Sequence, residues 1–351
     1  MQIKSISLSF LFIIPFLRVS AQDTVKVSTL AGLDNNAEKF YNSGLGKFAT
    51  KDFNGAIMDF NQALTLNANF DRAYFNRGLV KFEMKDVKGA IEDYTQAITR
   101  NDTCSQCYFS RAQAKYSIGD KEGASGDYTK DTERNPLHAQ AYYYRGGIKF
   151  ESKDYQGAVS DFDRAIQVKP DYAYAYNDRG SAKRQLEDYN GAAADYQKAT
   201  ELKSDMAFAY SNLGSMLRKK EDVKGAIAAY DKALKVKESH LVYNNRGSAK
   251  YDDGDYQGAV DDFSKAVKIK GDYAIAYNNR GAAKFKLKDY QGAISDYNKA
   301  IQLNAQYGFA FLNRGMAKEL IRDQTGACAD WNQAVQYGIE QGKIYLQDCK
   351  K

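Results

Sequence analysis

The sequence predicts an all-α fold, a superhelix of paired helices with a short capping helix at its C-terminus. Three patterns predict it. A marker glycine recurs every 34 residues, with one step of 33 and one alanine substitute. An alanine follows each marker by twelve residues, and an aromatic residue follows it by sixteen. The markers are Gly44, Gly78, Ala112, Gly146, Gly180, Gly214, Gly247, Gly281 and Gly315.

Length and composition set the bounds of this prediction. The 351 residues would allow two or three domains, but the repeat runs unbroken over residues 37–337 and predicts one continuous array of nine units. A hydrophobic fraction of 44% excludes a largely disordered chain, and the only long apolar run lies at the N-terminus, which excludes a multi-span membrane protein. His138 and His240 fall at unit boundaries without a partnered nucleophile, so no enzyme and no cofactor is expected.

The N-terminus is typical of an exported protein. Lys4 precedes an apolar stretch over residues 6–17 and a small-residue cleavage pattern at residues 19–21, so residues 1–21 are predicted to be a signal peptide. An uncleaved anchor is the alternative. No cysteine follows to make a lipoprotein, and a periplasmic or secreted protein is expected. Residues 22–36 read as a flexible leader. Loss of Lys4 and Arg18 lowers the net charge from +6 to +4, too small a surplus to indicate nucleic acid binding.

Each unit is expected to contain two helices. The first carries an aromatic residue four before the marker, such as Tyr74. The second begins at an aspartate, where a carboxylate caps free N–H groups and complements the helix dipole. Pro136 and Pro170 fall between units, where a helix has to stop. The aspartates are Asp52, Asp86, Asp120, Asp154, Asp188, Asp222, Asp255, Asp289 and Asp323.

This pattern of aromatic, Gly, Ala, aromatic, Ala and Pro resembles the tetratricopeptide repeat family over residues 37–337. The resemblance implies a solenoid whose first helices line a concave groove that receives extended peptides or partner helices. The lysines with which some family members grip acidic chaperone tails are replaced by aromatic residues and asparagines. That activity is therefore not implied here.

A charged trio recurs around most markers. Arginine precedes the marker in seven units, lysine follows it by three in eight, and aspartate follows it by fifteen in eight. The arginine and lysine are four apart and share one helix face. We favour a structural ion cluster over an anion-binding stripe. Representative trios are Arg77, Lys81 and Asp93, and Arg280, Lys284 and Asp296.

The sixth unit supports the structural interpretation. Leu213, Leu217 and Ala229 replace the whole trio there, which contacting residues would require because an unpaired buried charge is costly. In the first unit Ser43 replaces the arginine, so Asp59 could reach Arg77 of the next unit. Pairing within units and pairing between units both stay open.

Asparagines form a second series on the first helices. Asparagine has two donors and an acceptor that could pair with a peptide backbone. The alternatives are that the amides satisfy neighbouring helix ends or stay solvated. The series comprises Asn42, Asn76, Asn212, Asn245, Asn279 and Asn313 two before the marker, with Asn177, Asn244 and Asn278 one residue earlier.

Aromatic residues occupy one face of the first helices in the N-terminal half. They are spaced seven apart, as in Phe75 and Phe82, or Tyr143 and Phe150, with Phe109 in the third unit. Such a face is more often core than binding surface. If it is exposed, it makes an aromatic half-groove followed by a polar one.

The four cysteines fall into two pairs. Cys104 and Cys107 are expected to form a local disulfide, with two free thiols or a redox motif as alternatives. Two helices folded about Gly338 would bring Cys328 level with Cys349, so a disulfide that pins the capping helix over residues 338–351 is expected, with free buried thiols as the alternative.

The third unit is the outlier. It has Ala112 for glycine, and Asp131 where other units have a small buried alanine. Asp131 is either an interior acid or turned outward to Arg134, and a local irregularity or hinge is expected here.

These features predict a non-enzymatic scaffold that holds a protein or peptide in its concave groove. The alternative is a structural subunit of a cell-envelope or secretion assembly that uses its convex face and ends. We expect no metal, no nucleic acid and no small-molecule substrate, and contact with a membrane only through an assembly.

Overall fold

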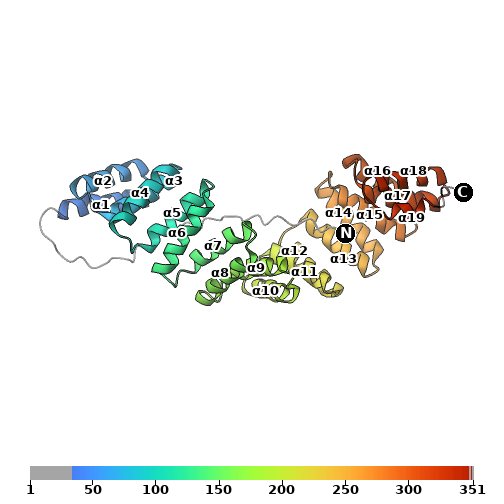
Figure 1. The fold of residues 1–351 in the computed structure, drawn as a ribbon, viewed down its shortest axis with the longest axis horizontal. Helices are drawn as coiled ribbons and strands as arrows, with labels where there is room; N and C mark the ends of the chain where they lie inside the picture. The colour runs from blue at the N-terminus through green and yellow to red at the C-terminus, as the bar shows by residue number, and fades with distance from the viewer. Residues whose placement is uncertain (1–33, 348, 350–351) are drawn as a thin grey trace.

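The computed structural model describes residues 34–347 and 349, and every regular element among them is a helix (Figure 1). Nineteen helices follow one another along an elongated, curved array from α1 at one end to α19 at the other. The predicted all-α superhelix is confirmed. The predicted signal peptide, and the leader up to residue 33, lie outside the described residues.

The odd-numbered helices are the first members of the pairs: α1 (Asp34–Ala49), α3 (Asp71–Glu83), α5 (Ser105–Ser117), α7 (Ala139–Glu151), α9 (Ala173–Gln185), α11 (Ala207–Lys219), α13 (His240–Asp252), α15 (Ala274–Lys286) and α17 (Gly308–Leu320). The even-numbered helices are the second members: α2 (Phe53–Leu66), α4 (Val87–Arg100), α6 (Lys121–Arg134), α8 (Tyr155–Val168), α10 (Tyr189–Leu202), α12 (Val223–Val236), α14 (Tyr256–Ile269), α16 (Tyr290–Leu303) and α18 (Gln324–Gln336). Helix α19 (Gly342–Tyr345) ends the array. Helix α1 begins at Asp34, inside the stretch expected to be leader.

Helix packing follows chain order. Each odd helix packs against the even helix after it, and each even helix packs against the next odd one. Neighbouring odd helices also contact each other, such as α1 with α3 and α13 with α15, and no comparable contact joins two even helices in the described part of the chain. The odd helices therefore line one continuous face of the array.

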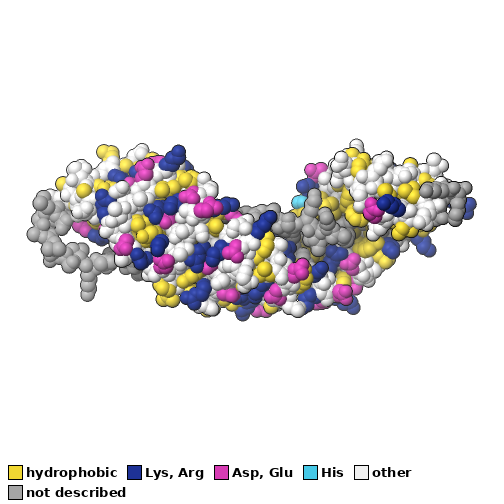
Figure 2. Space-filling view, in the orientation of Figure 1, with side chains coloured by type: hydrophobic (Ala, Val, Ile, Leu, Met, Phe, Trp, Pro, Cys, Tyr) yellow, Lys and Arg dark blue, Asp and Glu magenta, His cyan; other side chains and the backbone are white. Residues whose placement is uncertain are grey.

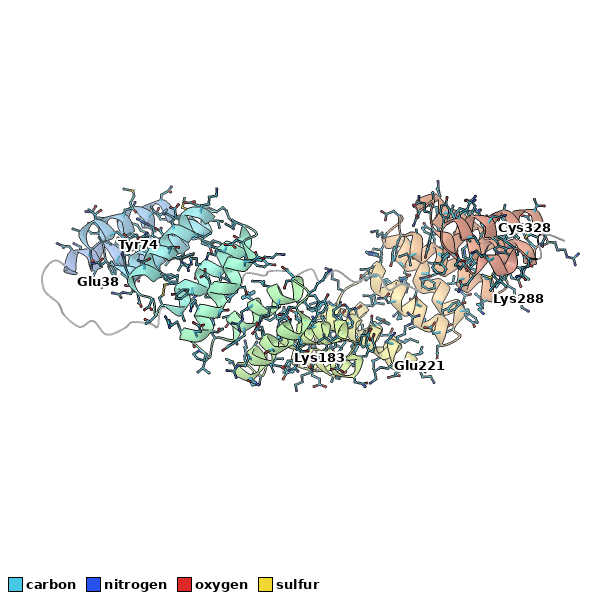
Figure 3. All side chains as sticks on the ribbon, in the orientation of Figure 1. Glu38, Tyr74, Lys183, Glu221, Lys288 and Cys328 are labelled. Atoms are coloured by element: carbon cyan, nitrogen blue, oxygen red, sulfur yellow. A yellow bond between two sulfur atoms is a disulfide. The ribbon has the colours of Figure 1, made fainter. Side chains whose placement is uncertain are left out.

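One aspartate both ends the first helix of a pair and starts the second. Before α4, the Asp86 backbone N–H donates to the Lys81 carbonyl, which closes α3, and the Asp86 carboxylate accepts the N–H of Gly89, which opens α4. Lys85 between them has a left-handed φ of 67°. All nine even helices have this aspartate cap, as the sequence predicted. Glu221 and Lys288, labelled in Figure 3, hold the left-handed position in two other turns.

The marker glycines and the core aromatics pack against each other within each pair. A Cβ on Gly78 would lie 2.7 Å from the ring of Tyr94, and one on Gly281 would lie 2.7 Å from the ring of Tyr297. These aromatic side chains are almost completely buried and carry much of the apolar burial of the fold. The glycine is thus where the two helices of a pair approach most closely.

The cap is smaller than the predicted helix over residues 338–351. Gly338 follows α18 and has a left-handed φ of 83°. Among the described residues after it, the one α-helix is the four-residue α19. Its Tyr345 stacks on Trp331, with ring centroids 5.1 Å apart, and a disulfide joins Cys328 to Cys349. One short turn suffices because Tyr345 packs against the last core cluster together with Ile339 and Leu346. Cys328 is labelled near the C-terminal end in Figure 3.

Candidate functional site

The charged trios form ion clusters inside seven of the nine helix pairs. Arg77 donates from Nη2 to Asp93 Oδ1 at 2.5 Å and from Nε to Oδ2 at 2.9 Å, and Lys81 Nζ lies 2.8 Å from Oδ2. The Asp93 side chain is almost fully buried. The same bidentate contact joins Arg111 to Asp127, Arg145 to Asp161, Arg179 to Asp195, Arg246 to Asp262, Arg280 to Asp296, and Arg314 to Asp330. Lys284 completes the Arg280 and Asp296 trio at 2.8 Å.

The same arginines also reach the preceding pair. The remaining nitrogen of Arg77, Nη1, donates to Asn61 Oδ1 of α2 at 2.6 Å. We call this contact the brace. The seven brace acceptors each follow a core aromatic residue: Asn61, Thr95, Thr129, Asp163, Asp231, Ser264 and Asn298. Pairing within units and pairing between units therefore both occur. Asp59 pairs with Lys47 at 2.7 Å and accepts from Ser43 at 2.6 Å, not with Arg77.

The sixth unit replaces both kinds of contact with apolar packing. Leu213 and Ala229 lie in one buried cluster, with Leu217 packed against it. At the brace position of the preceding helix stands Gln197, which donates to Glu201 of its own helix instead. The arginine and lysine of each trio already pair with a buried carboxylate. These cations are therefore unsuited to bind an external anion.

The asparagine series mainly ties odd helices together. Asn279 Nδ2 donates to Asn244 Oδ1 at 3.0 Å, Asn313 Nδ2 donates to Asn278 Oδ1 at 3.0 Å, and Asn212 Nδ2 donates to Asn177 Oδ1 at 3.2 Å. Asn76 makes the same type of contact with the Tyr41 hydroxyl at 3.0 Å. Each contact links side chains 35 residues apart on adjacent odd helices. The series therefore forms a structural ladder between adjacent odd helices, and most of its amides are not free to bind a peptide.

Some amide capacity remains on the exposed face. Asn42 is exposed, and Asn245 makes no side-chain hydrogen bond among the described residues. Asn212 and Asn313 are partly exposed and spend one donor each on the ladder; neither carbonyl oxygen accepts a hydrogen bond from a described residue. Of the series, these four side chains combine exposure with unused hydrogen-bonding groups, as a ligand would require.

The N-terminal aromatics pack against the core of the helix pairs. Phe109 is buried, and the ring centroids of Phe75 and Tyr143 lie 5.8 Å from those of the core residues Tyr94 and Phe162. Phe82 and Phe150 are likewise partly buried against core clusters. Phe109 therefore belongs to the core, whereas Phe75, Phe82, Tyr143 and Phe150 remain partly exposed, and their contribution to a groove stays a prediction.

A series of exposed or partly exposed large apolar side chains lies on the odd helices of the other half. They stand six residues before the marker, and we call them the C-terminal stripe: Tyr174, Phe208, Leu241, Ile275 and Phe309. Phe208 is 47% exposed, Leu241 38% and Phe309 41%. Tyr174 stacks on Phe208 with ring centroids 6.3 Å apart. In the first four units the same position holds Glu38, Arg72, Gln106 and Gln140, so the change of residue type at this position was the signal that sequence reasoning missed.

The odd helices turn this stripe and the remaining amides to the same side. Phe208 precedes Asn212, Leu241 precedes Asn245, and Phe309 precedes Asn313 by four residues, which is one helix turn. The arrangement offers large apolar contacts beside amide groups, a combination that suits a polypeptide ligand. The face shown in Figure 2 mixes Lys, Arg, Asp and Glu side chains with small apolar areas.

Models of the tetratricopeptide repeat match residues 71–104, 109–173, 177–239, 247–288 and 274–307, together more than half of the chain. The chain belongs to the tetratricopeptide repeat family. The first and last helix pairs lie outside the matched segments, so the count of nine repeats stays a prediction.

Several solved structures are similar to this chain. A protein from Parabacteroides merdae is 18% identical and has a TM-score of 0.50, with 71% of this chain and 99% of that chain covered. Pseudomonas aeruginosa pilF is 16% identical and also has a TM-score of 0.50, with 57% and 92% covered. YrrB, described as a TPR protein with an unusual peptide-binding site, is 21% identical over 53% of this chain and 97% of its own, with a TM-score of 0.47. A comparison with curated proteins finds no relative that matches this sequence.

A buried acid lies where the two halves of the repeat array meet. Asp178 on α9 accepts hydrogen bonds from the Tyr143 hydroxyl at 2.7 Å and from Asn177 Nδ2 at 2.8 Å. Burial raises the pKa of Asp178 to about 6, although both hydrogen bonds favour the charged form. Six other repeats have a neutral asparagine at this position.

In the third repeat, Asp131 points inward. It is fully buried, and its Oδ2 lies 2.6 Å from His138 Nδ1. Its Oδ1 has no hydrogen-bond partner among the described residues. Arg134 pairs with Asp102 instead, at 3.0 Å. The outward alternative for Asp131 is therefore wrong, and His138 takes the role of its partner.

Among the described residues, no group of three or more His, Cys, Asp or Glu side chains is arranged to hold a metal ion. No described helix is both long and apolar enough to cross a membrane.

Proposed function

We propose that this tetratricopeptide repeat protein is an exported, non-enzymatic scaffold that holds a segment of a partner protein on its odd-helix face. The family fold supports a protein-interaction role. Export is supported by the predicted signal peptide at residues 1–21 and by the two disulfides, which persist in oxidising compartments.

The C-terminal stripe carries the proposal. Five large apolar side chains in register on consecutive odd helices are partly exposed, and an exposed contiguous apolar surface marks an interaction site. Asn212, Asn245 and Asn313 lie one helix turn away, and the amide groups that they do not use in the ladder supply polar contacts. The segment we expect to bind has apolar side chains facing the stripe and backbone groups facing the amides.

A double substitution tests the stripe. Phe208→Gln with Phe309→Gln introduces the residue that Gln106 and Gln140 already provide at the same position, so the fold should tolerate it. After affinity capture from an envelope fraction and identification of the partner, the double variant should bind the purified partner at least tenfold more weakly, about 1.4 kcal/mol. The matched control is Met58→Gln on α2, which is 70% exposed on an even helix.

Two further outcomes bear on the proposal. If the stripe variant keeps its affinity for the partner and an even-helix variant loses it, binding on the odd-helix face is overturned. The alternative, a structural subunit that uses its convex face, is then favoured. Cross-linking followed by mass spectrometry should map the partner segment to α9, α11, α13, α15 and α17. Fractionation of cells that express the tagged protein tests export, and recovery with the cytoplasmic fraction would contradict it.

A further inference from the structure

The disulfide between Cys104 and Cys107 lies at the start of α5 and has no role in the proposed binding surface. Cys107 is 1% exposed, at a position where Ala73, Ala141 and Ala175 are fully buried in other repeats. Cys104 is partly exposed, in the loop that precedes the helix. Cys104 is thus the more exposed residue of the pair, and Cys107 is enclosed by the core.

Cys104 is also the helix cap. Its Sγ accepts the backbone N–H of Cys107 at 3.2 Å. The odd helices α3, α7, α9, α11, α13, α15 and α17 have no side-chain cap at this position. The first turn of α5 has no acidic residue, and the nearby Asp102 is paired with Arg134.

These contacts favour a negative charge on the exposed sulfur. The capping N–H and the positive end of the helix dipole both stabilise a thiolate at Cys104, which is what makes a cysteine a good leaving group and nucleophile. A disulfide that serves only to hold the loop requires neither the exposed sulfur nor the cap.

We propose that the Cys104–Cys107 pair is a thiol–disulfide exchange site whose partner is an external thiol. The external thiolate attacks Cys104 Sγ, the bond to Cys107 breaks, and its electron pair leaves on Cys107 Sγ. A second external thiolate then attacks the sulfur that the first one contributed, and Cys104 leaves as the stabilised thiolate. Two external thiols are oxidised to one disulfide, and the protein disulfide is reduced to a dithiol.

The disulfide between Cys328 and Cys349 is an internal control, because Cys328 lies within α18 and neither sulfur caps a helix N-terminus. The oxidised full chain is treated with limiting dithiothreitol, alkylated, and analysed by peptide mass spectrometry. Cys104 and Cys107 should be released at least tenfold faster than the control pair. In urea the two rates should approach each other, because the cap is lost.

Single variants identify the reacting sulfur. Cys107→Ala restores the alanine of other repeats, so the fold is kept, and leaves Cys104 as a free thiol. It should take up glutathione from oxidised glutathione and react with iodoacetamide at least tenfold faster than Cys107 does in Cys104→Ala. The Cys104 reaction should also persist to lower pH than that of free cysteine. Equal release of both disulfides in the folded chain, or a Cys104 thiol no faster than the same thiol in urea, would overturn the proposal.

Discussion

The Asp178 carboxylate accepts a 2.7 Å hydrogen bond from the Tyr143 hydroxyl across two adjacent odd helices. This contact occupies the position of a ladder rung that two asparagines form elsewhere, as between Asn244 and Asn279. A charge therefore replaces an amide at one buried rung of the ladder.

We expect the contribution of Asp178 to the stability of the protein to fall as pH rises from about 4 to about 6. Burial raises the pKa of Asp178 from 3.8 to about 6, so between these values the folded chain binds a proton that the unfolded chain does not. Stability is then lost as pH rises, by about 3 kcal/mol in total. At pH values above 6, Asp178→Asn should raise the urea concentration at the unfolding midpoint. At pH values below 4, the substitution should leave that midpoint unchanged. The exposed Asp205→Asn serves as the control, and a pH-independent effect of Asp178→Asn would contradict the assignment.

Replacing the left-handed residue of a turn with glycine should stabilise the protein. Lys85 is exposed and has a φ of 67°, a region where a side chain costs about 1 kcal/mol. Lys85→Gly should therefore gain somewhat less than about 1 kcal/mol, since glycine also raises the entropy of the unfolded chain. Lys88→Gly inside α4 should instead lose about 1 kcal/mol. Thermal melts show whether each substitution raises or lowers the stability. A loss of stability in both variants would contradict backbone strain at Lys85.

The ion clusters should behave as units. Asp93→Ala leaves Arg77 and Lys81 without their buried acceptor, and we expect a loss of about 3–5 kcal/mol. The triple change Arg77→Leu, Lys81→Leu and Asp93→Ala reproduces the sixth repeat and should lose far less than the single change. Urea midpoints of both variants provide the measurement. A triple variant less stable than Asp93→Ala would show that the charges contribute more than apolar packing can replace.

The cap disulfide should be visible through Trp331, the single tryptophan of the chain. Trp331 is fully buried and stacked under Tyr345, close to the disulfide between Cys328 and Cys349. Replacing both cysteines with serine should cost about 3 kcal/mol and shift the tryptophan emission to the red as the cap frays. The variant in which Cys104 and Cys107 are alanines should leave the emission unchanged. An unshifted spectrum in the cap variant would mean that packing alone holds α19 in place.

Local features of the fold were predictable because they depend on neighbours in the chain. The aspartate caps, the close approach at the marker glycines and the arginine–aspartate trios all follow from residues at most sixteen apart. The length of the cap was not predictable, since it depends on how much of Trp331 remains to be covered.

The binding face was only partly predictable. A helix pattern indicates that Asn279 and Asn244 share a type of position, but not that their amides meet across adjacent helices. The same limit applies to Phe75, whose ring reaches the core because Tyr94 lies within its range. The C-terminal stripe was within reach of the sequence, through the change from Gln140 to Tyr174 at one position of the repeat.

The brace is missing in the middle of the array, where Leu213 replaces the arginine. Braces join the first five pairs to one another and the last four pairs to one another, and between α10 and α11 the brace is absent. The braces thus divide the array into two blocks, and the joint between them is made by apolar packing and by the contact between Asn177 and Asn212. Tyr174 and Phe208 stack across that joint, so a ligand that lies along the stripe would splint the two blocks together.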